Sequence, residues 1–322
     1  MRSVNREKPR LIAIVGPTAS GKTALSVRLA QALQGDVLCC DSMQIYRRMD
    51  IGTAKPTAEE QAGIRHRLFD FVEPSEAYSC ADYVRDAQAE LEAVYAEGRL
   101  PILCGGTGLY LDSLLRGGGF EETEVDTALR AELMQYAAEH GNHALHQRLL
   151  EVDSESAERI HENNVKRVVR ALEIYMTTGM TKTEADLRSR KEESPYRATV
   201  IGIRFQDREL LYDRIGQRVD RMLADGLLDE TRALLDEGVF ARNATAAQAI
   251  GYKELLGYLN GEQTKEEAVE LLKRSTRRYA KRQLTWFGAK EYVRWIDADA
   301  NGRMRSADDV LAEAMDVIAR ER

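Results

Sequence analysis

The residues with the clearest chemical potential lie near the start of the chain, at Gly16–Thr23. Their sequence, GPTASGKT, fits the pattern G-x-x-x-x-G-K-[ST] at every fixed position. The Lys22 ammonium can reach a terminal phosphate, and the Thr23 hydroxyl can bind Mg²⁺. Backbone N–H groups of such a loop close on phosphate oxygens. We expect a di- or triphosphate to bind here, through Gly16, Pro17, Thr18, Ala19, Ser20, Gly21, Lys22 and Thr23.

The flanking residues supply the elements that such a loop requires. The apolar run Leu11–Val15 predicts a buried strand. After the loop, leucines recur every four residues, which predicts a helix that ends near Gly35. An ordinary glycine turn needs neither flank, so the order strand, loop and helix favours a phosphate site.

A second chemical group, Asp41, follows a second apolar run at Asp36–Cys40. In a parallel sheet the carboxyl ends of the strands line the ligand crevice, so Asp41 should lie near the phosphate loop. It could serve as a general base or bind magnesium through a water molecule. The alternative is an aspartate that only caps a turn.

A glycine pair follows the third predicted strand, Pro101–Cys104, in the sequence GGTGLY. We expect this strand to lie beside the first. Gly105 and Gly106 then either approach a ligand closely or make a tight turn. Between the second and third strands, Ser79 and Asp82 predict a capping box that starts a helix ending near Gly98.

The pattern changes after Arg116, where Gly117–Gly119 suggests a hinge and residues 126–190 read as helices alone. The last of these predicted helices has an apolar face that contains Val165, Val168, Val169, Leu172 and Met176. A further strand is predicted only at Ala198–Ile203. A crossover this long indicates an insertion. We therefore predict an α/β fold, a P-loop NTPase-like parallel sheet flanked by helices, with a core at residues 1–120 and 197–322 and an all-helical insertion at 121–196.

Cations gather on two helices of the C-terminal third. Arg214, Arg218 and Arg221 share one helical face. A longer helix, starting at a Thr264–Glu267 capping box, carries six cations within residues 273–282, followed by Trp286. Such a face suits RNA phosphates and stacked bases. It could equally be a solvated face paired with neighbouring glutamates.

Composition narrows the function classes. The 322 residues are 43% hydrophobic and 31% charged, and no stretch approaches the roughly 18 apolar residues of a membrane span. The four cysteines are scattered, so we expect no disulfide framework or zinc site, and a cytoplasmic protein. A net charge of −7 argues against nucleic acid unless cations cluster locally.

The motifs alone favour a P-loop kinase of a nucleoside or small metabolite. A motor ATPase would need a strand that ends in paired acidic residues, and a GTP switch would need an Asn-Lys-x-Asp sequence; neither appears. A noncatalytic RNA-binding module is disfavoured by the intact Lys22 and Thr23.

Six blocks, in order along nearly the whole chain, resemble the bacterial tRNA dimethylallyltransferases. These enzymes transfer an isopentenyl group to the adenosine just 3′ of the tRNA anticodon. The departures are Arg48, Arg65 and Gly288, none of which is in the expected chemistry. The blocks are GPTASGKT, DSMQIYRRMDIGTAKP (41–56), GGTGLY, NNVKRVVRALE (163–173), AIGYKEL (249–255) and RQLTWF (282–287).

This resemblance implies that dimethylallyl diphosphate binds the loop and that its diphosphate is the leaving group. Lys22, Arg218 and Mg²⁺ bound at Thr23 would stabilise that group, and Thr107 would bond near the reacting centre. Asp41 would accept a proton from the adenine amine. A P-loop kinase remains the alternative.

The resemblance also implies that the protein binds the anticodon stem-loop of tRNA, with the 121–196 insertion as an RNA-binding part. We expect a monomer. The reacting adenine must leave its stack to enter the pocket. The residues expected to contact tRNA are Asp41, Ser42, Met43, Gln44, Thr107, Arg130, Arg167, Arg170, Lys253, Arg282 and Trp286.

Overall fold

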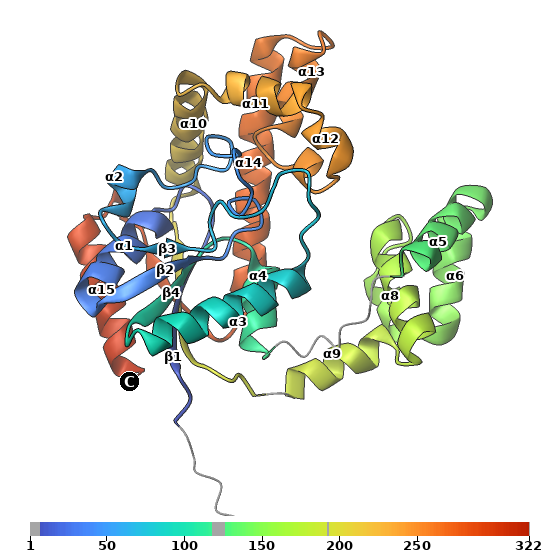
Figure 1. Ribbon diagram of the computed structural model, residues 1–322, viewed down its shortest axis with the longest axis horizontal. Helices are drawn as coiled ribbons and strands as arrows, with labels where there is room; N and C mark the ends of the chain where they lie inside the picture. The colour runs from blue at the N-terminus through green and yellow to red at the C-terminus, as the bar shows by residue number, and fades with distance from the viewer. Residues whose placement is uncertain (1–6, 118–125, 192, 322) are drawn as a thin grey trace, which may run out of the picture. The chain divides into compact units, whose positions relative to one another are not determined.

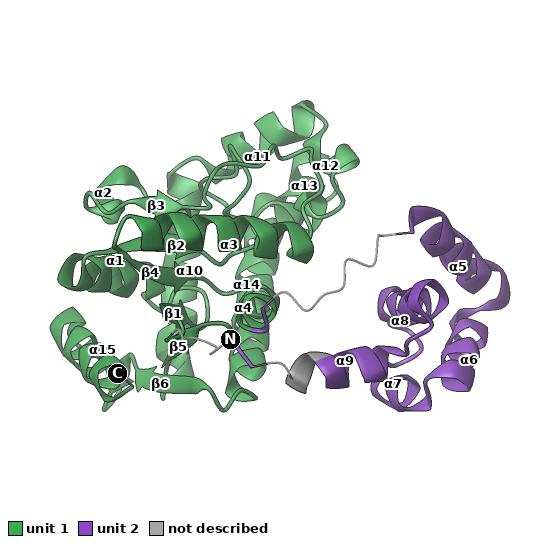
Figure 2. Ribbon diagram, turned by 60° about the horizontal axis from the view of Figure 1, so that its bottom comes forward, with its two compact units in different colours: residues 1–115, 195–322 green, residues 116–194 purple. Residues whose placement is uncertain are grey.

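The computed structural model describes residues 7–117, 126–191 and 193–321. The chain forms two compact units, Met1–Leu115 with Pro195–Arg322, and Arg116–Ser194 (Figure 2). We call them the core unit and the helical unit. The predicted division was 1–120 with 197–322, and 121–196. The predicted boundary at residue 121 and hinge residues Gly118 and Gly119 lie outside the described residues.

The core unit is built on a six-stranded parallel sheet, which confirms the predicted fold class (Figure 1). The strand order is β3-β2-β4-β1-β5-β6. Strand β4 pairs with β1, as expected. The strands are β1 (Arg10–Val15), β2 (Gly35–Cys39), β3 (His66–Arg67), β4 (Leu100–Cys104), β5 (Arg197–Arg204) and β6 (Val293–Asp297). The four predicted strands are therefore confirmed, and the two edge strands β3 and β6 were missed.

Alternate residues of β1 enter two different hydrophobic clusters, because helices cover both faces of the sheet. Leu11 and Ala13 pack with residues of α3 (Cys80–Ala96) and α4 (Gly108–Leu115). Ile12 and Ile14 pack with residues of α1 (Lys22–Leu33), α10 (Arg208–Ala224) and α15 (Ala307–Arg320). The Ser79 capping box at α3 is confirmed.

A third cluster fixes the segment that follows β2. Ile45, Tyr46 and Met49 are fully buried against residues of the C-terminal helices. These helices are α11 (Leu227–Asp236), α12 (Val239–Arg242), α13 (Lys253–Leu259) and the start of α14 (Lys265–Gly288). The Thr264–Glu267 capping box at α14 is confirmed. The short elements α2 (Ala58–Gln61), η1 (Ala246–Gln248), β7 (Asp299–Ala300) and β8 (Arg303–Met304) complete the unit.

The helical unit has its own core, in which Leu133, Leu149, Val168 and Leu172 are almost fully buried. Met176, expected on the same apolar face, is 55% exposed, because the last turn of its helix extends past that core. The helices are α5 (Thr127–His140), α6 (Asn142–Val152), α7 (Ser154–Arg159), α8 (Val165–Thr178) and α9 (Lys182–Lys191).

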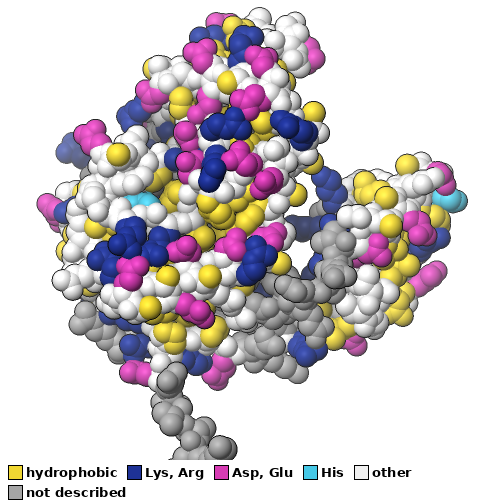
Figure 3. Space-filling model, viewed as in Figure 1, with side chains coloured by type: hydrophobic (Ala, Val, Ile, Leu, Met, Phe, Trp, Pro, Cys, Tyr) yellow, Lys and Arg dark blue, Asp and Glu magenta, His cyan; other side chains and the backbone are white. Residues whose placement is uncertain are grey.

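Charges of both signs are interspersed over the core unit on the face shown in Figure 3. The net charge of −7 therefore does not produce a uniformly acidic surface there. Among the described helices, none has the length and apolarity to cross a membrane.

Candidate active site

The Gly16–Thr23 loop joins β1 to α1, and its backbone is shaped by close contacts. At Gly16, which has φ +138°, an added Cβ would lie 2.5 Å from the Ile203 carbonyl oxygen, so only glycine fits. Helix α1 begins at Lys22, directly after Gly21, and the positive end of its dipole therefore faces the loop. The Lys22 Nζ donates to the Pro17 carbonyl oxygen at 2.6 Å. This arrangement holds a cation and a helix N-terminus at one point, as an anion site requires.

Two helices that lie far from this loop in the sequence form hydrogen bonds with its backbone. Arg214 of α10 donates from Nε to the Ala19 carbonyl oxygen at 2.9 Å. Gln283 of α14 accepts the Thr18 N–H at Oε1, also at 2.9 Å. Because Thr18 already donates to Gln283, its N–H does not contribute to the predicted diphosphate contact. Sequence reasoning did not single out Gln283.

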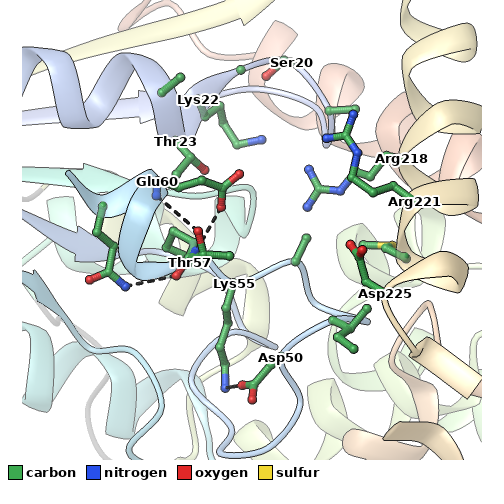
Figure 4. Close-up of a pocket in the computed structure, with 18 of the residues that line it drawn as sticks. Ser20, Lys22, Thr23, Asp50, Lys55, Thr57, Glu60, Arg218, Arg221 and Asp225 are labelled. Carbon is green, nitrogen blue, oxygen red and sulfur yellow. Dashed lines mark hydrogen bonds and ion pairs between the residues drawn. The ribbon is translucent and has the colours of Figure 1, made fainter. Parts of the chain in front are cut away.

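A cavity of about 880 Å³ opens next to the loop. Figure 4 shows Lys22 and Thr23 on one side of it and Arg218 and Arg221 across from them. Cations thus face one another near the N-terminus of α1, although the lining of the cavity also includes the acidic side chains of Asp50, Glu60, Asp70 and Asp225. The cavity is lined by residues 19–24, by Arg214, Gln217, Arg218, Arg221 and Met222 of α10, by Asp225 directly after that helix, and by parts of residues 50–70.

The electrostatics of this cavity favour an anionic ligand. Burial lowers the pKa of the Lys22 ammonium to about 8, and the nearby positive charge of Arg218 adds to this effect. Burial also lowers the pKa of the Arg218 guanidinium, while the Asp41 charge opposes that shift. A bound diphosphate would supply the negative charge that these two cations lack.

Asp41 and Thr107 lie just after the neighbouring strands β2 and β4, and each accepts a backbone hydrogen bond from the segment that follows Asp41. Thr107 Oγ1 accepts the Ser42 N–H at 3.0 Å, and its hydroxyl lies 3.3 Å from the Ser42 hydroxyl oxygen. Asp41 Oδ1 accepts the Met43 N–H at 2.9 Å. The charge of Asp41 acts on both Lys22 and Arg218, although Asp41 does not line the 880 Å³ cavity. Asp41, Lys22 and Arg218 therefore form one electrostatic neighbourhood, and Thr107 is bonded to the N–H of Ser42, the residue next to Asp41.

The glycines of the GGTG sequence allow other segments of the protein to pack closely against them. An added Cβ at Gly105 would lie 1.9 Å from the Cys40 carbonyl oxygen. At Gly106 it would lie 1.9 Å from Gln283 Nε2, and at Gly108 it would lie 2.2 Å from Trp286 Cδ1. These glycines let β2 and α14 pack directly against the loop that carries Thr107.

The remaining residues of the DSMQ sequence also have roles within the protein. Gln44 donates from Nε2 to the carbonyl oxygens of Thr53 and Ala54, both at 3.0 Å. Met43 is half-buried against the third cluster. Among the described residues, therefore, the amide donor of Gln44 is already used to fold the segment that lines the cavity.

The expected RNA contacts on α13 and α14 are accessible. Arg282 is exposed, with its guanidinium 5.5 Å from the centre of the Tyr279 ring. Trp286 is 38% exposed, and the Lys290 Nζ lies 5.3 Å from its ring centre. Lys253 begins α13 and is close to Glu254. Lys273 pairs with Asp220 at 2.7 Å, so this cation of the 273–282 group already has a partner within the protein.

In the helical unit, two of the three predicted arginines converge on one buried carboxylate. Arg130 donates from Nε to both oxygens of Glu173 at 2.9 Å, and Arg170 donates from Nη1 to Glu173 Oε2 at 2.7 Å. The Glu173 side chain is fully buried, whereas both arginines are about one-third exposed. Arg167 is exposed and forms no ion pair among the described residues. Sequence reasoning did not single out Glu173; its place four positions after the apolar Val169, on the same helical face, is the signal that could have identified it.

No group of three or more His, Cys, Asp or Glu side chains that could hold a metal ion occurs in the described part of the chain. Thr23 and the acidic Glu60 and Asp225 do line the cavity. Mg²⁺ commonly binds through one or two protein groups, with phosphate oxygens of the substrate and water completing its shell. The Thr23 hydroxyl fits such a site.

The chain is similar to known proteins in family, in sequence and in structure. The model of the family described as IPP transferase matches residues 44–290. A tRNA dimethylallyltransferase from Halalkalibacterium halodurans is 48% identical over 290 residues, covering 90% of this chain and 91% of that protein. One from Acetivibrio thermocellus is 48% identical over 289 residues, covering 90% and 92%.

Solved structures give a similar result. The full-length tRNA isopentenylpyrophosphate transferase of Bacillus halodurans matches with a TM-score of 0.72 and 45% identity, over 98% of this chain and 97% of that chain. A eukaryotic dimethylallyltransferase acting on tRNA matches with a TM-score of 0.82 and 28% identity, over 97% of this chain and 80% of that chain.

Proposed function

The chain belongs to the IPP transferase family, and we propose that it is a tRNA dimethylallyltransferase that takes its prenyl group from dimethylallyl diphosphate held at the Gly16–Thr23 loop. The observation that carries the proposal is the cavity beside that loop, where Lys22, Arg218 and Arg221 converge on the N-terminus of α1. This geometry suits a diphosphate leaving group, because charge develops there as the allylic C–O bond breaks.

The acceptor is the N6 amine of the adenosine just 3′ of the anticodon. Its lone pair is delocalised into the ring, so it needs a carboxylate to take its proton as the N6–C bond forms. Asp41 has this role. Its charge acts on Lys22 and Arg218, which supports a site where the amine and the leaving group are held close together. Thr107, bonded to Ser42, orients the reacting groups.

The atoms balance without a further reactant. The C–O bond of the donor breaks, the bond from C1 of the dimethylallyl group to N6 forms, the amine proton passes to Asp41, and diphosphate leaves. Mg²⁺, held by the Thr23 hydroxyl and the diphosphate oxygens, would neutralise part of the leaving-group charge.

The tRNA contacts divide between the two units. In the core unit they are the exposed Arg282 and Trp286 of α14, with Lys253 of α13 and the Asp41–Gln44 segment. In the helical unit they are Arg167 and the Arg130–Arg170 pair, which the buried Glu173 holds in a fixed geometry. These positions suit an anticodon stem-loop, whose phosphates need cations and whose unstacked bases need aromatic surfaces.

We further propose that the enzyme acts as a monomer in the cytoplasm. All four cysteines are free, and three of them are buried, which fits a reducing compartment.

The experiment that tests the function offers two labelled donors to the purified protein with tRNA. One carries label in the dimethylallyl group of dimethylallyl diphosphate, and the other carries it in the γ-phosphate of ATP. The proposal expects prenyl label in an adenosine of the anticodon loop and release of unlabelled diphosphate. Phosphate label transferred to a nucleoside or metabolite would instead support the P-loop kinase that the motifs alone left open.

A further inference from the structure

Gln283 is a buried polar side chain on the helix expected to meet RNA. It is 4% exposed, while its neighbour Arg282 faces solvent. Its amide has two partners that are far away in sequence. Oε1 accepts the Thr18 N–H at 2.9 Å, and Nε2 donates to the Gly106 carbonyl oxygen at 3.1 Å.

The orientation of this amide follows from its partners. A backbone N–H can only donate and a carbonyl oxygen can only accept, so the oxygen must face Thr18 and the nitrogen must face Gly106. The packing leaves no room for a substitute at Gly106, where an added Cβ would lie 1.9 Å from Gln283 Nε2. A side chain of this length, with an acceptor oxygen on one side of its amide and a donor nitrogen on the other, is therefore matched to both loops.

We propose that Gln283 is a positioning residue that sets the distance between the donor loop and the loop of Thr107. On one side it holds Thr18 of the diphosphate loop. On the other it holds Gly106, the residue directly before Thr107. The inference rests on the proposed function, since these loops bind the leaving group and orient the acceptor.

The contacts of Tyr279, also on α14, support the same role for this helix. Burial raises the pKa of the Tyr279 hydroxyl, and side-chain hydrogen bonds with Thr107 and Gln283 oppose that shift. Tyr279 lies one helical turn before Gln283 on α14. The inner face of α14 thus contacts both reactive loops, while its outer face carries Arg282 and the partly exposed Trp286.

The first test compares kinetics of Gln283→Met and Gln283→Glu in the intact enzyme, with dimethylallyl diphosphate and tRNA. Gln283→Met keeps the volume but leaves both buried partners unsatisfied, and should lower kcat/KM for the donor ~10–100-fold. Gln283→Glu keeps the acceptor for Thr18 but sets a carboxylate oxygen against Gly106. It should leave the donor KM within ~3-fold and lower kcat ~10-fold.

Thr276→Val is the matched control. Thr276 is also buried on α14, but its hydroxyl donates only to the Leu272 carbonyl oxygen within the helix. This variant should keep the wild-type kcat and KM even where its thermal midpoint falls. Wild-type kinetics in Gln283→Met, alongside a lowered thermal midpoint, would mean that Gln283 only stabilises the fold and would overturn the inference.

A double-mutant cycle keeps the inference testable if Gln283→Met unfolds. Gly106→Ala alone should push Gln283 away and cost ~100-fold in kcat/KM. In a Gln283→Ala background the clash is gone, so the double variant should match Gln283→Ala within ~3-fold. Additive losses would refute the proposed coupling. If the wild type itself transfers no prenyl group, the proposed function fails instead, which separates the two outcomes.

Discussion

The two candidate functional regions of this chain are built in different ways. The donor site of the core unit is assembled from backbone groups of separate segments, held by Arg214, Gln283 and the glycines of GGTG. The candidate RNA surface of the helical unit depends on exposed cations and on one buried carboxylate, Glu173. The first tolerates few substitutions because backbone positions are fixed by packing. The second should lose affinity gradually, one charge at a time.

The largest effect should come from Lys22→Ala. Its ammonium is the buried cation nearest the start of α1, and removing one such stabilising donor commonly lowers kcat ~10²–10³-fold. The affinity for tRNA should stay unchanged, because in the proposed reaction Lys22 contacts the leaving group and not the RNA. Steady-state kinetics and a filter-binding titration measure the two quantities. The exposed Lys265→Ala is the control for loss of one positive charge, and an equal loss of tRNA binding in Lys22→Ala would contradict the assignment.

Asp41→Asn should come next. The amide keeps the shape and the contact with the Met43 N–H but cannot accept a proton from the adenine amine. We expect single-turnover rates to fall ~10²-fold with little change in donor affinity. A rate close to that of the wild type would exclude Asp41 as the general base and leave it a structural role in the turn.

The pH dependence of kcat/KM for dimethylallyl diphosphate should show a dependence on one buried cation that the RNA surface of the helical unit lacks. The pKa of Lys22 is lowered to about 8, so the free enzyme loses this charge as the pH rises through 8. The kcat/KM for dimethylallyl diphosphate should then fall, at most ~10-fold per pH unit. In Lys22→Arg, whose guanidinium stays charged, the decline near pH 8 should disappear.

The lowered pKa of the Lys22 ammonium should also affect the stability of the fold. Between pH 8 and 10.5 the unfolded chain holds a proton on Lys22 that the folded chain has released. The free energy of unfolding should therefore rise with pH across this window as far as Lys22 contributes. Denaturant titrations of wild type and Lys22→Met at several pH values would isolate that contribution, and identical pH profiles would contradict the lowered pKa.

The smallest effect should come from Arg167→Ala. This exposed side chain is expected to contact one phosphate, so its loss should weaken tRNA binding ~3-fold and reduce the log–log salt slope by slightly less than one unit. Arg170→Ala should differ, because it also removes a partner of the buried Glu173 and so lowers the thermal midpoint. An unchanged salt slope in both variants would remove the helical unit from the RNA interface.

Sequence reasoning predicted the parts of this structure that depend on local pattern. The strand, loop and helix around Gly16–Thr23, the capping boxes at Ser79 and Thr264, and the order of β1 beside β4 are all confirmed. Strand β3 was missed because its two residues are too short to show alternation. Strand β6 was missed as well, since an edge strand of five residues gives a weak signal.

The missed contacts of the site are those between distant segments. Gln283 lies in a highly charged helix, where a glutamine reads as a surface residue, and its bond to Thr18 spans 265 positions. Arg214 was seen as part of a cationic row, but its contact with Ala19 spans 195 positions. Such contacts depend on how helices pack on the sheet, which residue types and spacing do not encode locally.

The most direct test of where the donor and the tRNA bind is to remove the helical unit. A chain in which a flexible linker replaces residues 116–194 should keep the thermal transition of the core and bind dimethylallyl diphosphate with a Kd within ~3-fold of the intact protein. Its affinity for tRNA should fall at least ~10-fold, and the salt dependence of the remaining binding should be weaker. If the shortened chain folds yet loses the donor, or captures tRNA as tightly as the intact protein, the assignment of the donor site to the core unit alone and of part of the tRNA contacts to the helical unit is contradicted.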